Sequence, residues 1–195
     1  MNFLAHLHIA HHCGSNLLGN LLGDFVKGDP NRDYEPEIAA GIRLHRFVDS
    51  YTDSATILLR AKQHFPQGHR RFAGIALDVF WDHCLATHWE NYHPLPLDLF
   101  CQQSESIVKQ TDVGMLPERF ILVSENMWRG RWLESYQSLD NIEIALSRMS
   151  ARRDSMAPLK ECYPYLQRHY GDLQQLFAEF YPELLRASQD FSVER

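Results

Sequence analysis

The sequence predicts an all-helical protein, because apolar residues recur at spacings of three and four along most of the chain while strict alternation is scarce. Glycine and proline interrupt these periodic segments, as at Gly28-Asp29-Pro30 and Pro66, where helices are expected to end. The chain has 195 residues, of which 45% are hydrophobic. That content suits one sizeable core, so we expect a single compact multi-helix domain spanning 1–195.

Each predicted helix has a local justification. Asn2 is the expected N-cap of a first helix that ends near His12, and Ser15 is the expected cap of a second. The third begins near Pro36, a favoured first-turn residue, and ends near Tyr51. The segment 91–98 carries two prolines and is expected to be a loop. The remaining helices are expected at 55–65, 70–89, 99–110, 117–128, 139–152, 159–170 and 173–187.

Composition limits the function classes. No apolar run reaches the roughly 18–20 residues that span a bilayer. The first ten residues are interrupted by His6 and His8 and lack a basic region, so no signal peptide is expected. The cysteines are far apart, form no CxxC pair, and indicate reduced thiols in a cytoplasmic protein; they are Cys13, Cys84, Cys101 and Cys162.

The charge distribution is uneven. The net charge is −6, so nucleic acid is not the expected partner, and no membrane partner is expected either. Between Arg43 and Arg71, however, six basic residues stand against two acids, and Arg148, Arg152 and Arg153 form a second basic cluster. Such zones suit an anionic ligand or an acidic protein partner, or they are ordinary solvated helix faces. The sequence does not fix the oligomeric state.

Polar side chains fall on two predicted core faces. On the third helix Ile38, Ile42, His45 and Asp49 form one stripe, and on the fifth Ile75, Asp78, Asp82, Leu85 and Trp89 form another. Buried ionised groups are costly unless they are paired or bind metal. Asp24 has the same character because it follows the apolar run of the second helix, and His6 and His83 are further candidates. Gly19 and Gly23 are interpreted as helix-packing glycines rather than a phosphate loop.

These side chains allow two readings. A mixed carboxylate–imidazole set suits Mn²⁺, Mg²⁺ or Fe²⁺, with Asp24, His45, Asp49, Asp78 and Asp82 as candidate ligands. Alternatively each is a structural hydrogen-bonding residue: Asp78 could cap a neighbouring helix, and Asp49 could pair with Arg46 or Arg43. His64 and His169 fit no predicted constellation.

Several segments resemble the acyl carrier protein phosphodiesterase family. They are MNFLAHLHIA (1–10), GNLLGDFVKG (19–28), GIRLHRFVDSYTD (41–53), LDVFWDHCLATHW (77–89), WRGRWLESY (128–136) and MSARR (149–153). The resemblance covers nearly the full length and is specific in combination. It implies a helical, divalent-metal enzyme, with Mn²⁺ prominent, distantly related to HD-type phosphohydrolases. The adjacent His-Asp pair of that superfamily is absent, and Asp82-His83 stands in reversed order, so its ligand set is not transferred.

The resemblance implies that the substrate is holo-acyl carrier protein and that the products are the apo-protein and 4′-phosphopantetheine. A bound metal would lower the pKa of water and polarise a phosphoryl oxygen. Asp24 is a predicted catalytic residue, His6 or His83 a ligand or proton donor, and Arg46 a stabiliser of phosphate charge. The alternatives are an HD-like nucleotide phosphohydrolase and a non-catalytic protein that binds acyl carrier protein. Either basic zone could dock the acidic carrier protein.

Overall fold

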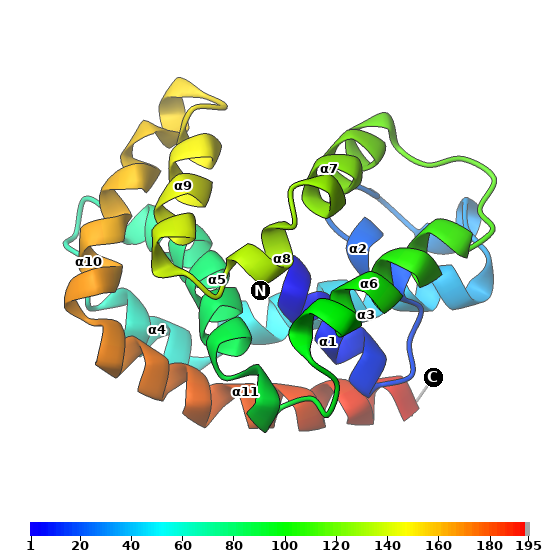
Figure 1. The fold of residues 1–195 in the computed structure, drawn as a ribbon, viewed down its shortest axis with the longest axis horizontal. Coiled ribbons are helices and arrows are strands. Elements are labelled where there is room, and N and C mark those ends of the chain that lie inside the picture. Colours follow the sequence, from blue (N-terminus) through cyan, green and yellow to red (C-terminus); the bar gives the residue numbers. More distant parts are fainter. Residues whose placement is uncertain (194–195) are drawn as a thin grey trace.

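The computed structural model describes residues 1–193, and every regular element in that range is a helix, which confirms the predicted fold class (Figure 1). The α-helices are α1 (Phe3–His12), α2 (Leu17–Leu22), α3 (Pro36–Ser54), α4 (Thr56–Lys62), α5 (Arg70–Thr87), α6 (Leu97–Gln110), α7 (Glu118–Arg129), α8 (Trp132–Ser135), α9 (Leu139–Ser150), α10 (Tyr163–Arg168) and α11 (Tyr170–Val193). Three short 3₁₀ helices are η1 (Pro30–Arg32), η2 (Trp89–Asn91) and η3 (Asp154–Cys162). None of the helices in this range is long and apolar enough to cross a bilayer.

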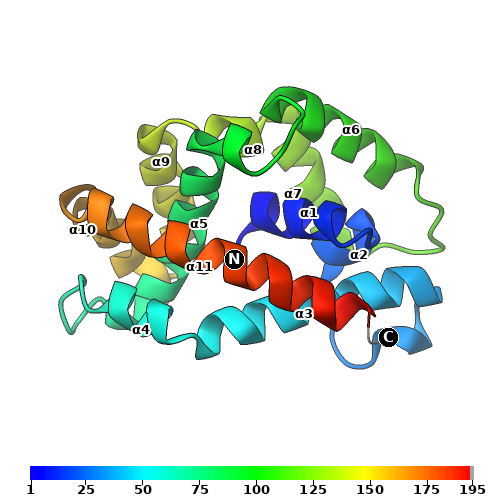
Figure 2. The same ribbon diagram turned by 90° about the horizontal axis from the view of Figure 1, so that it is seen from below.

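Helix α1 lies at the centre of the fold, where it contacts α2, α3, α5 and α11 (Figures 1 and 2). Its sequence is apolar around most of its circumference, and a helix of that kind has to be covered on all sides. The long α11 covers one side of it and also contacts α3, α4 and α5. The central position of α1 explains why His6 and His8, which are polar, are both buried.

Helices α2 and α3 pack with their backbones in contact. A Cβ atom on Gly19 would lie 2.3 Å from the carbonyl oxygen of Ile38 and 3.0 Å from the Cα of Gly41. A Cβ on Gly23 would overlap the imidazole of His45, at 2.1 Å from its Cγ. The prediction of packing glycines is therefore confirmed. Their absent side chains bring the end of α2, and with it Asp24, against the His45 side of α3.

Local chemistry moves several boundaries from their predicted positions. Asn16, not Ser15, caps α2, because its Oδ1 accepts the Gly19 N–H at 2.8 Å, while the Ser15 hydroxyl accepts from Asn20. The helix predicted at 159–170 is divided between η3 and α10. Helix α8 was not predicted; it begins after Arg131, whose φ of 48° places that residue in the left-handed region.

The contact between α2 and α3 predicts opposite effects for two glycine substitutions. Gly19→Ala is expected to lower the free energy of unfolding by about 1–3 kcal/mol, because its methyl group forces the two backbones apart. Gly74→Ala is the matched control: its Cβ would meet only the Lys62 side chain, at 3.6 Å. It should leave stability unchanged or raise it by about 0.4–1 kcal/mol. Urea unfolding followed by circular dichroism measures both, and equal effects would contradict the close approach of α2 and α3.

Candidate metal centre

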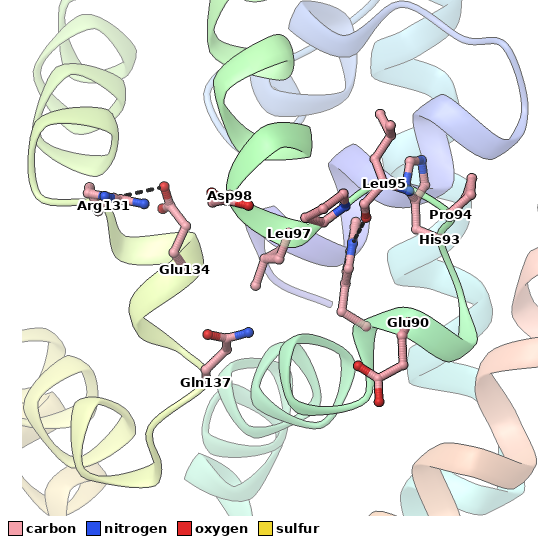
Figure 3. A pocket seen from close by; sticks show the side chains of 11 residues that line it. Glu90, His93, Pro94, Leu95, Leu97, Asp98, Arg131, Glu134 and Gln137 are labelled. Atoms are coloured by element: carbon pink, nitrogen blue, oxygen red, sulfur yellow. Dashed lines mark hydrogen bonds and ion pairs between the residues drawn. The ribbon is translucent and has the colours of Figure 1, made fainter.

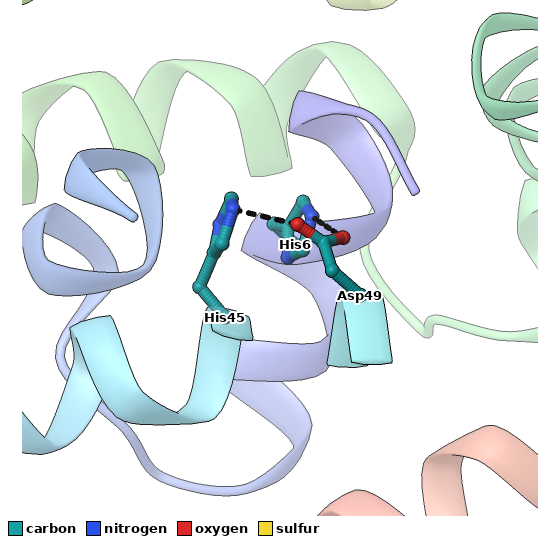
Figure 4. A group of neighbouring side chains, drawn as sticks. All are labelled: His6, His45 and Asp49. Carbon is teal, nitrogen blue, oxygen red and sulfur yellow. Dashed lines mark ion pairs between the residues drawn. The ribbon is translucent and has the colours of Figure 1, made fainter. Parts of the chain in front are cut away.

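Four polar side chains converge where α1, α2 and α3 meet. His6 comes from α1, His45 and Asp49 from successive turns of α3, and Asp24 from the segment after α2. The Nε2 atom of His6 lies 3.2 Å from Oδ1 of Asp49, and the Nε2 atom of His45 lies 3.1 Å from Oδ2 of the same carboxylate (Figure 4). Asp24 approaches from outside, with its Oδ1 3.6 Å from Nε2 of His45. We call these four residues the His/Asp cluster.

Neighbouring backbone groups orient the His45 ring. Its Nδ1–H donates to the backbone oxygen of Asn20 at 2.7 Å, which directs Nε2 toward the two aspartates. Gly23 leaves the space that the ring occupies. A hydrogen bond from the remote ring nitrogen to a carbonyl is the usual way in which a ligating histidine is fixed. The contact between α2 and α3 therefore prepares His45 for ligation.

The unsatisfied nitrogens of the His/Asp cluster fit a cation. Both ring nitrogens of His6 and the Nε2 of His45 are buried, and none has a hydrogen bond of acceptable geometry within residues 1–193. Buried polar atoms without partners are unfavourable. One ligand atom from each of His6, His45 and Asp49 lies within 4.8 Å of the others. Metal–ligand bonds of about 2.0–2.2 Å could bridge that spacing after small side-chain adjustments. Asp24 is close enough to supply a fourth ligand.

The two stacked imidazoles have opposite electrostatic character. Their ring centroids are 3.8 Å apart, so two positive charges would repel each other there. Burial, followed by the charge of the neighbouring His45, lowers the pKa of His6 to about 4. Burial also opposes charge on His45, but the carboxylates of Asp24 and Asp49 outweigh it and raise the pKa of His45 to about 9. In this state the cluster carries its positive charge on His45, between two carboxylates.

Asp78, a predicted ligand, lies outside the His/Asp cluster. Its Oδ1 accepts from the amino group of Met1 at 2.9 Å, and Oδ1 of Asp49 lies 3.4 Å from the same nitrogen. Burial opposes charge on this amino group, but Asp78 and Asp49 outweigh it and raise its pKa to about 11. Asp78 therefore forms an ion pair beside the cluster, and its role as a metal ligand stays a prediction.

Asp82, another predicted ligand, binds the N-terminus of α1. Its two carboxylate oxygens accept the backbone N–H groups of Leu4 and Ala5 at 2.8 and 3.0 Å. First-turn N–H groups have no partner inside their own helix, so a carboxylate from α5 completes α1. Burial raises the pKa of Asp82 to about 7, although these two N–H groups oppose the rise. Asp82 positions α1, and thereby His6, without contacting the cluster.

His83 and Arg46, predicted as catalytic, also have structural partners elsewhere. His83 lies 2.6 Å from the backbone oxygen of Tyr136 through Nδ1 and 3.0 Å from the hydroxyl of Tyr170 through Nε2. Arg46 donates to the backbone oxygens of Val26 and Gly28, both at 2.7 Å. Arg46 therefore secures the segment after α2 and contributes indirectly to the position of Asp24.

A cavity of about 560 Å³ opens beside the cluster, and Asp24 is part of its lining. Arg119 from α7 and Arg148 and Arg152 from the region of α9 line it as well. Within residues 1–193 no acidic side chain forms an ion pair with any of these three arginines. Arg119 was not singled out from the sequence; its guanidinium lies 5.5 Å from the centre of the Phe25 ring, next to Asp24. Unpaired guanidinium groups near a candidate metal centre suit a phosphorylated ligand.

Another cavity, of about 460 Å³, is electrostatically unsuited to such a ligand (Figure 3). Glu90, Asp98 and Glu134 line it, and its arginine, Arg131, lies 3.1 Å from the Glu134 carboxylate. The surplus of carboxylates would repel a phosphate.

A second group of possible ligands consists of His64, His169 and Asp172, which the sequence did not connect. The group lies near the surface, with Asp172 exposed and 3.9 Å from Nδ1 of His169. The adjacent cavity contains Arg60, whose Nη1 lies 3.4 Å from the Glu179 carboxylate. It lacks the unpaired arginines that border the His/Asp cluster.

The fold and the site together define a class: an all-helical protein with a histidine–carboxylate centre beside an arginine-lined cavity, an arrangement suited to metal-assisted hydrolysis of a phosphoester. The profile of the family described as acyl carrier protein phosphodiesterase matches residues 1–184. The chain therefore belongs to the acyl carrier protein phosphodiesterase family. The predicted family and the predicted enzyme class, a phosphoric diester hydrolase, are confirmed.

Similar full-length proteins carry the same family name. The acyl carrier protein phosphodiesterase of Klebsiella pneumoniae (strain 342) is 42% identical over 194 residues, which cover 97% of this chain and 98% of the relative. Those of Pectobacterium atrosepticum and Yersinia pestis are each 43% identical over 190 residues, with the same coverage of both chains. No solved structure matches the chain. The likeness to HD-type hydrolases therefore stays a prediction.

The His/Asp cluster predicts metal-dependent stability. An excess of Mn²⁺ at about 100 times its dissociation constant should stabilise the wild type by about 2.7 kcal/mol. His45→Asn and Asp49→Asn should lose most of that gain, because each removes a ligand. Asp172→Asn, in the second group, should retain it. Thermal melting with Mn²⁺ and with chelator measures all four proteins. Loss of the gain in Asp172→Asn alone would place the metal at the second group instead.

Proposed function

We propose that the chain hydrolyses the phosphodiester between 4′-phosphopantetheine and the serine of holo-acyl carrier protein, and that the reaction takes place at the His/Asp cluster. The observation that carries this proposal is the convergence of His6, His45 and Asp49, with imidazole Nε2 atoms that lack a hydrogen bond of acceptable geometry, beside an arginine-lined cavity. Family membership supports the substrate, since the relatives are named acyl carrier protein phosphodiesterases. All four cysteines are free, which agrees with the proposed cytoplasmic location.

His6, His45, Asp49 and Asp24 would hold the divalent cation. A mixed set of imidazoles and carboxylates suits Mn²⁺, which we propose as the physiological metal, with Mg²⁺ and Fe²⁺ as alternatives. When bound, the cation lowers the pKa of water and polarises a phosphoryl oxygen. The half-buried Asp49 carboxylate would offer one oxygen toward each imidazole, as it does in this structure. His6 is 1% exposed and does not line the cavity, which favours ligation over proton donation to a leaving group.

Asp24 has a position that suits proton transfer. Its side chain is 62% exposed and lines the cavity, while its carboxylate also approaches Nε2 of His45. The neighbouring His45 imidazole lowers the pKa of Asp24, so this carboxylate is ionised at neutral pH and able to accept a proton from the attacking water. Arg119 and Arg148 would bind phosphoryl oxygens as charge develops. The water oxygen bonds to phosphorus as the bond between phosphorus and the serine oxygen breaks, and the proton accepted by Asp24 passes to the departing serine oxygen.

The two predicted basic zones differ in how their charges are used. Arg43 donates to Asn31, Arg46 to two backbone oxygens, and Arg60 pairs with Glu179. Arg148 and Arg152, by contrast, line both the cavity and an adjoining open groove of about 980 Å³. Arg119, Arg129 and Arg153 also line that groove. We therefore assign docking of the acidic carrier protein to this five-arginine groove rather than to the zone between Arg43 and Arg71.

The direct test incubates holo-acyl carrier protein with the chain and Mn²⁺ and measures the mass of the carrier protein. Wild type should convert it to the apo-form, whereas Asp24→Ala should lower the rate by about 10²–10⁴-fold while remaining folded. Asp172→Asn should act like wild type. No conversion by wild type with Mn²⁺, Mg²⁺ or Fe²⁺, together with turnover in a nucleotide panel, would replace this function by a nucleotide phosphohydrolase. Near-normal activity of Asp24→Ala would remove Asp24 from the reaction.

Docking on the five-arginine groove predicts a salt-dependent KM. Raising salt shortens electrostatic attraction to about 8 Å at physiological ionic strength, so KM should rise with salt while kcat changes less. Arg153→Ala should raise KM by roughly two- to fivefold at low salt, because it removes one exposed charge from the groove. Arg43→Ala, which removes an arginine outside the groove, should leave KM unchanged. Steady-state kinetics from low to moderate salt measure these values; a larger effect from Arg43→Ala would move docking to the other basic zone.

A further inference from the structure

The cavity beside the His/Asp cluster and the five-arginine groove share part of their linings. Arg119, Arg148 and Arg152 belong to both, together with Trp132 and Met149. The three arginines therefore stand at the boundary where the enclosed cavity meets the open groove. Arg129 and Arg153 line the groove alone. All five arginines lie in the groove or at this boundary, and none lies only in the cavity.

The part of the cavity beyond the boundary is mostly uncharged. Its lining there includes the neutral polar residues Asn2, Tyr136 and Asn141 and the apolar residues Ile144 and Ala145, with Asp24 as its charged member. A space of this kind suits a neutral, flexible ligand with a few hydrogen-bonding groups. Its volume of about 560 Å³ lies within the roughly 300–1,000 Å³ typical of small-molecule sites and is far too small for a protein.

Two side-chain amides in this region have unused acceptors. The Nδ2 group of Asn141 donates to the backbone oxygen of Ser135 at 2.8 Å, and the Nδ2 group of Asn2 lies 3.4 Å from the Tyr136 hydroxyl. In the described part of the chain no donor reaches the Oδ1 atom of either asparagine. Both carbonyl oxygens are thus available to N–H or O–H groups of a ligand.

Residues of α9 order these features along one face. Asn141, Ala145 and Arg148 follow at intervals of four and three on α9, so they form one stripe, and Arg152 comes just after the helix ends. At a rise of 1.5 Å per residue, Asn141 and Arg148 stand about 10 Å apart along the helix. Along this stripe the side chains change from an amide (Asn141) to an apolar group (Ala145) and then to a cation (Arg148). A ligand along it would be neutral at one end and anionic at the other.

We propose that this cavity binds the 4′-phosphopantetheine arm, with its phosphate at the arginine boundary near Asp24 and its amide-containing chain against Asn141, Ala145 and Asn2. The inference rests on the proposed function for the orientation of the substrate. The carrier protein lies in the five-arginine groove, and the arm enters the cavity from there. The arm carries two amides, one hydroxyl group and a terminal thiol, which match a neutral lining with free carbonyl acceptors. The cavity thereby selects the arm, whereas the groove selects the acidic protein.

The test measures binding of the free product, 4′-phosphopantetheine, by calorimetry in the presence of Mn²⁺. Wild type should bind it, and Ala145→Trp should weaken binding at least about tenfold, because the indole fills the cavity; a factor of ten corresponds to about 1.4 kcal/mol. Ser147→Trp is the control, since it places the same bulk on an exposed face of α9 outside the cavity. Asn141→Ala, which removes the amide without adding bulk, should weaken binding as well and guards against misfolding of Ala145→Trp.

The outcomes separate this inference from the proposed function. If wild type hydrolyses holo-acyl carrier protein but Ala145→Trp binds the product and turns over substrate as wild type does, the arm lies elsewhere and the proposed function stands. If wild type binds the product, Ala145→Trp does not, and wild type leaves holo-acyl carrier protein intact, the site stands and the proposed function fails. Equal weakening by Ala145→Trp and Ser147→Trp would overturn the assignment of the cavity.

Discussion

Two buried imidazoles that share one carboxylate are the constraint on which the rest of this structure depends. His6 and His45 stack at 3.8 Å, and both approach the carboxylate of Asp49. Such a group is unfavourable in an apolar interior unless it binds a charge or is held in place from outside. The fold meets this constraint by fixing the helices rather than the side chains alone. Asp82 completes the N-terminus of α1, and the glycine contact between α2 and α3 sets the place of His45.

Charge is separated in space around this centre. Asp24 and Asp49 lie beside the buried imidazoles, and Arg119 of α7 and Arg148 of α9 line the cavity that Asp24 also lines. An anionic phosphodiester would be repelled by bare carboxylates, so a cation held in the cluster would act together with the guanidinium groups that line the cavity. The same separation continues outward, where the groove remains basic while the inner cavity is mostly neutral. One substrate with an acidic protein, a phosphate and a neutral arm matches that sequence of environments.

The sequence predicted the helical fold and part of the cluster from spacing alone. His45 and Asp49 fell on one stripe with Ile38 and Ile42, and they do lie together in the structure. Periodicity reports which face of a helix is buried, but not what lies opposite that face. Asp82 was therefore correctly expected to point inward. It was predicted to be a metal ligand, whereas in the structure its carboxylate accepts hydrogen bonds from the N-terminus of α1.

The remaining differences have the same origin. His83 and Arg46 form hydrogen bonds with backbone carbonyl groups of distant segments, and no local sequence pattern predicts such partners. Arg119 lies far from the other site residues in sequence and reaches the site through the position of α7 on Phe25. Helix α8 depends on the left-handed backbone of Arg131, a conformation that a non-glycine residue rarely adopts.

The central claim is that His6 and His45 bind one divalent cation, and pulsed electron paramagnetic resonance of bound Mn²⁺ tests it most directly. Modulation from directly coordinated imidazole nitrogens counts histidine ligands without requiring substrate or turnover. The account predicts two such nitrogens in the wild type, one in His45→Asn, and two in His64→Asn, which alters the second group. Absence of nitrogen modulation in the wild type, or its loss in His64→Asn with retention in His45→Asn, would contradict the assignment of the metal centre to the His/Asp cluster.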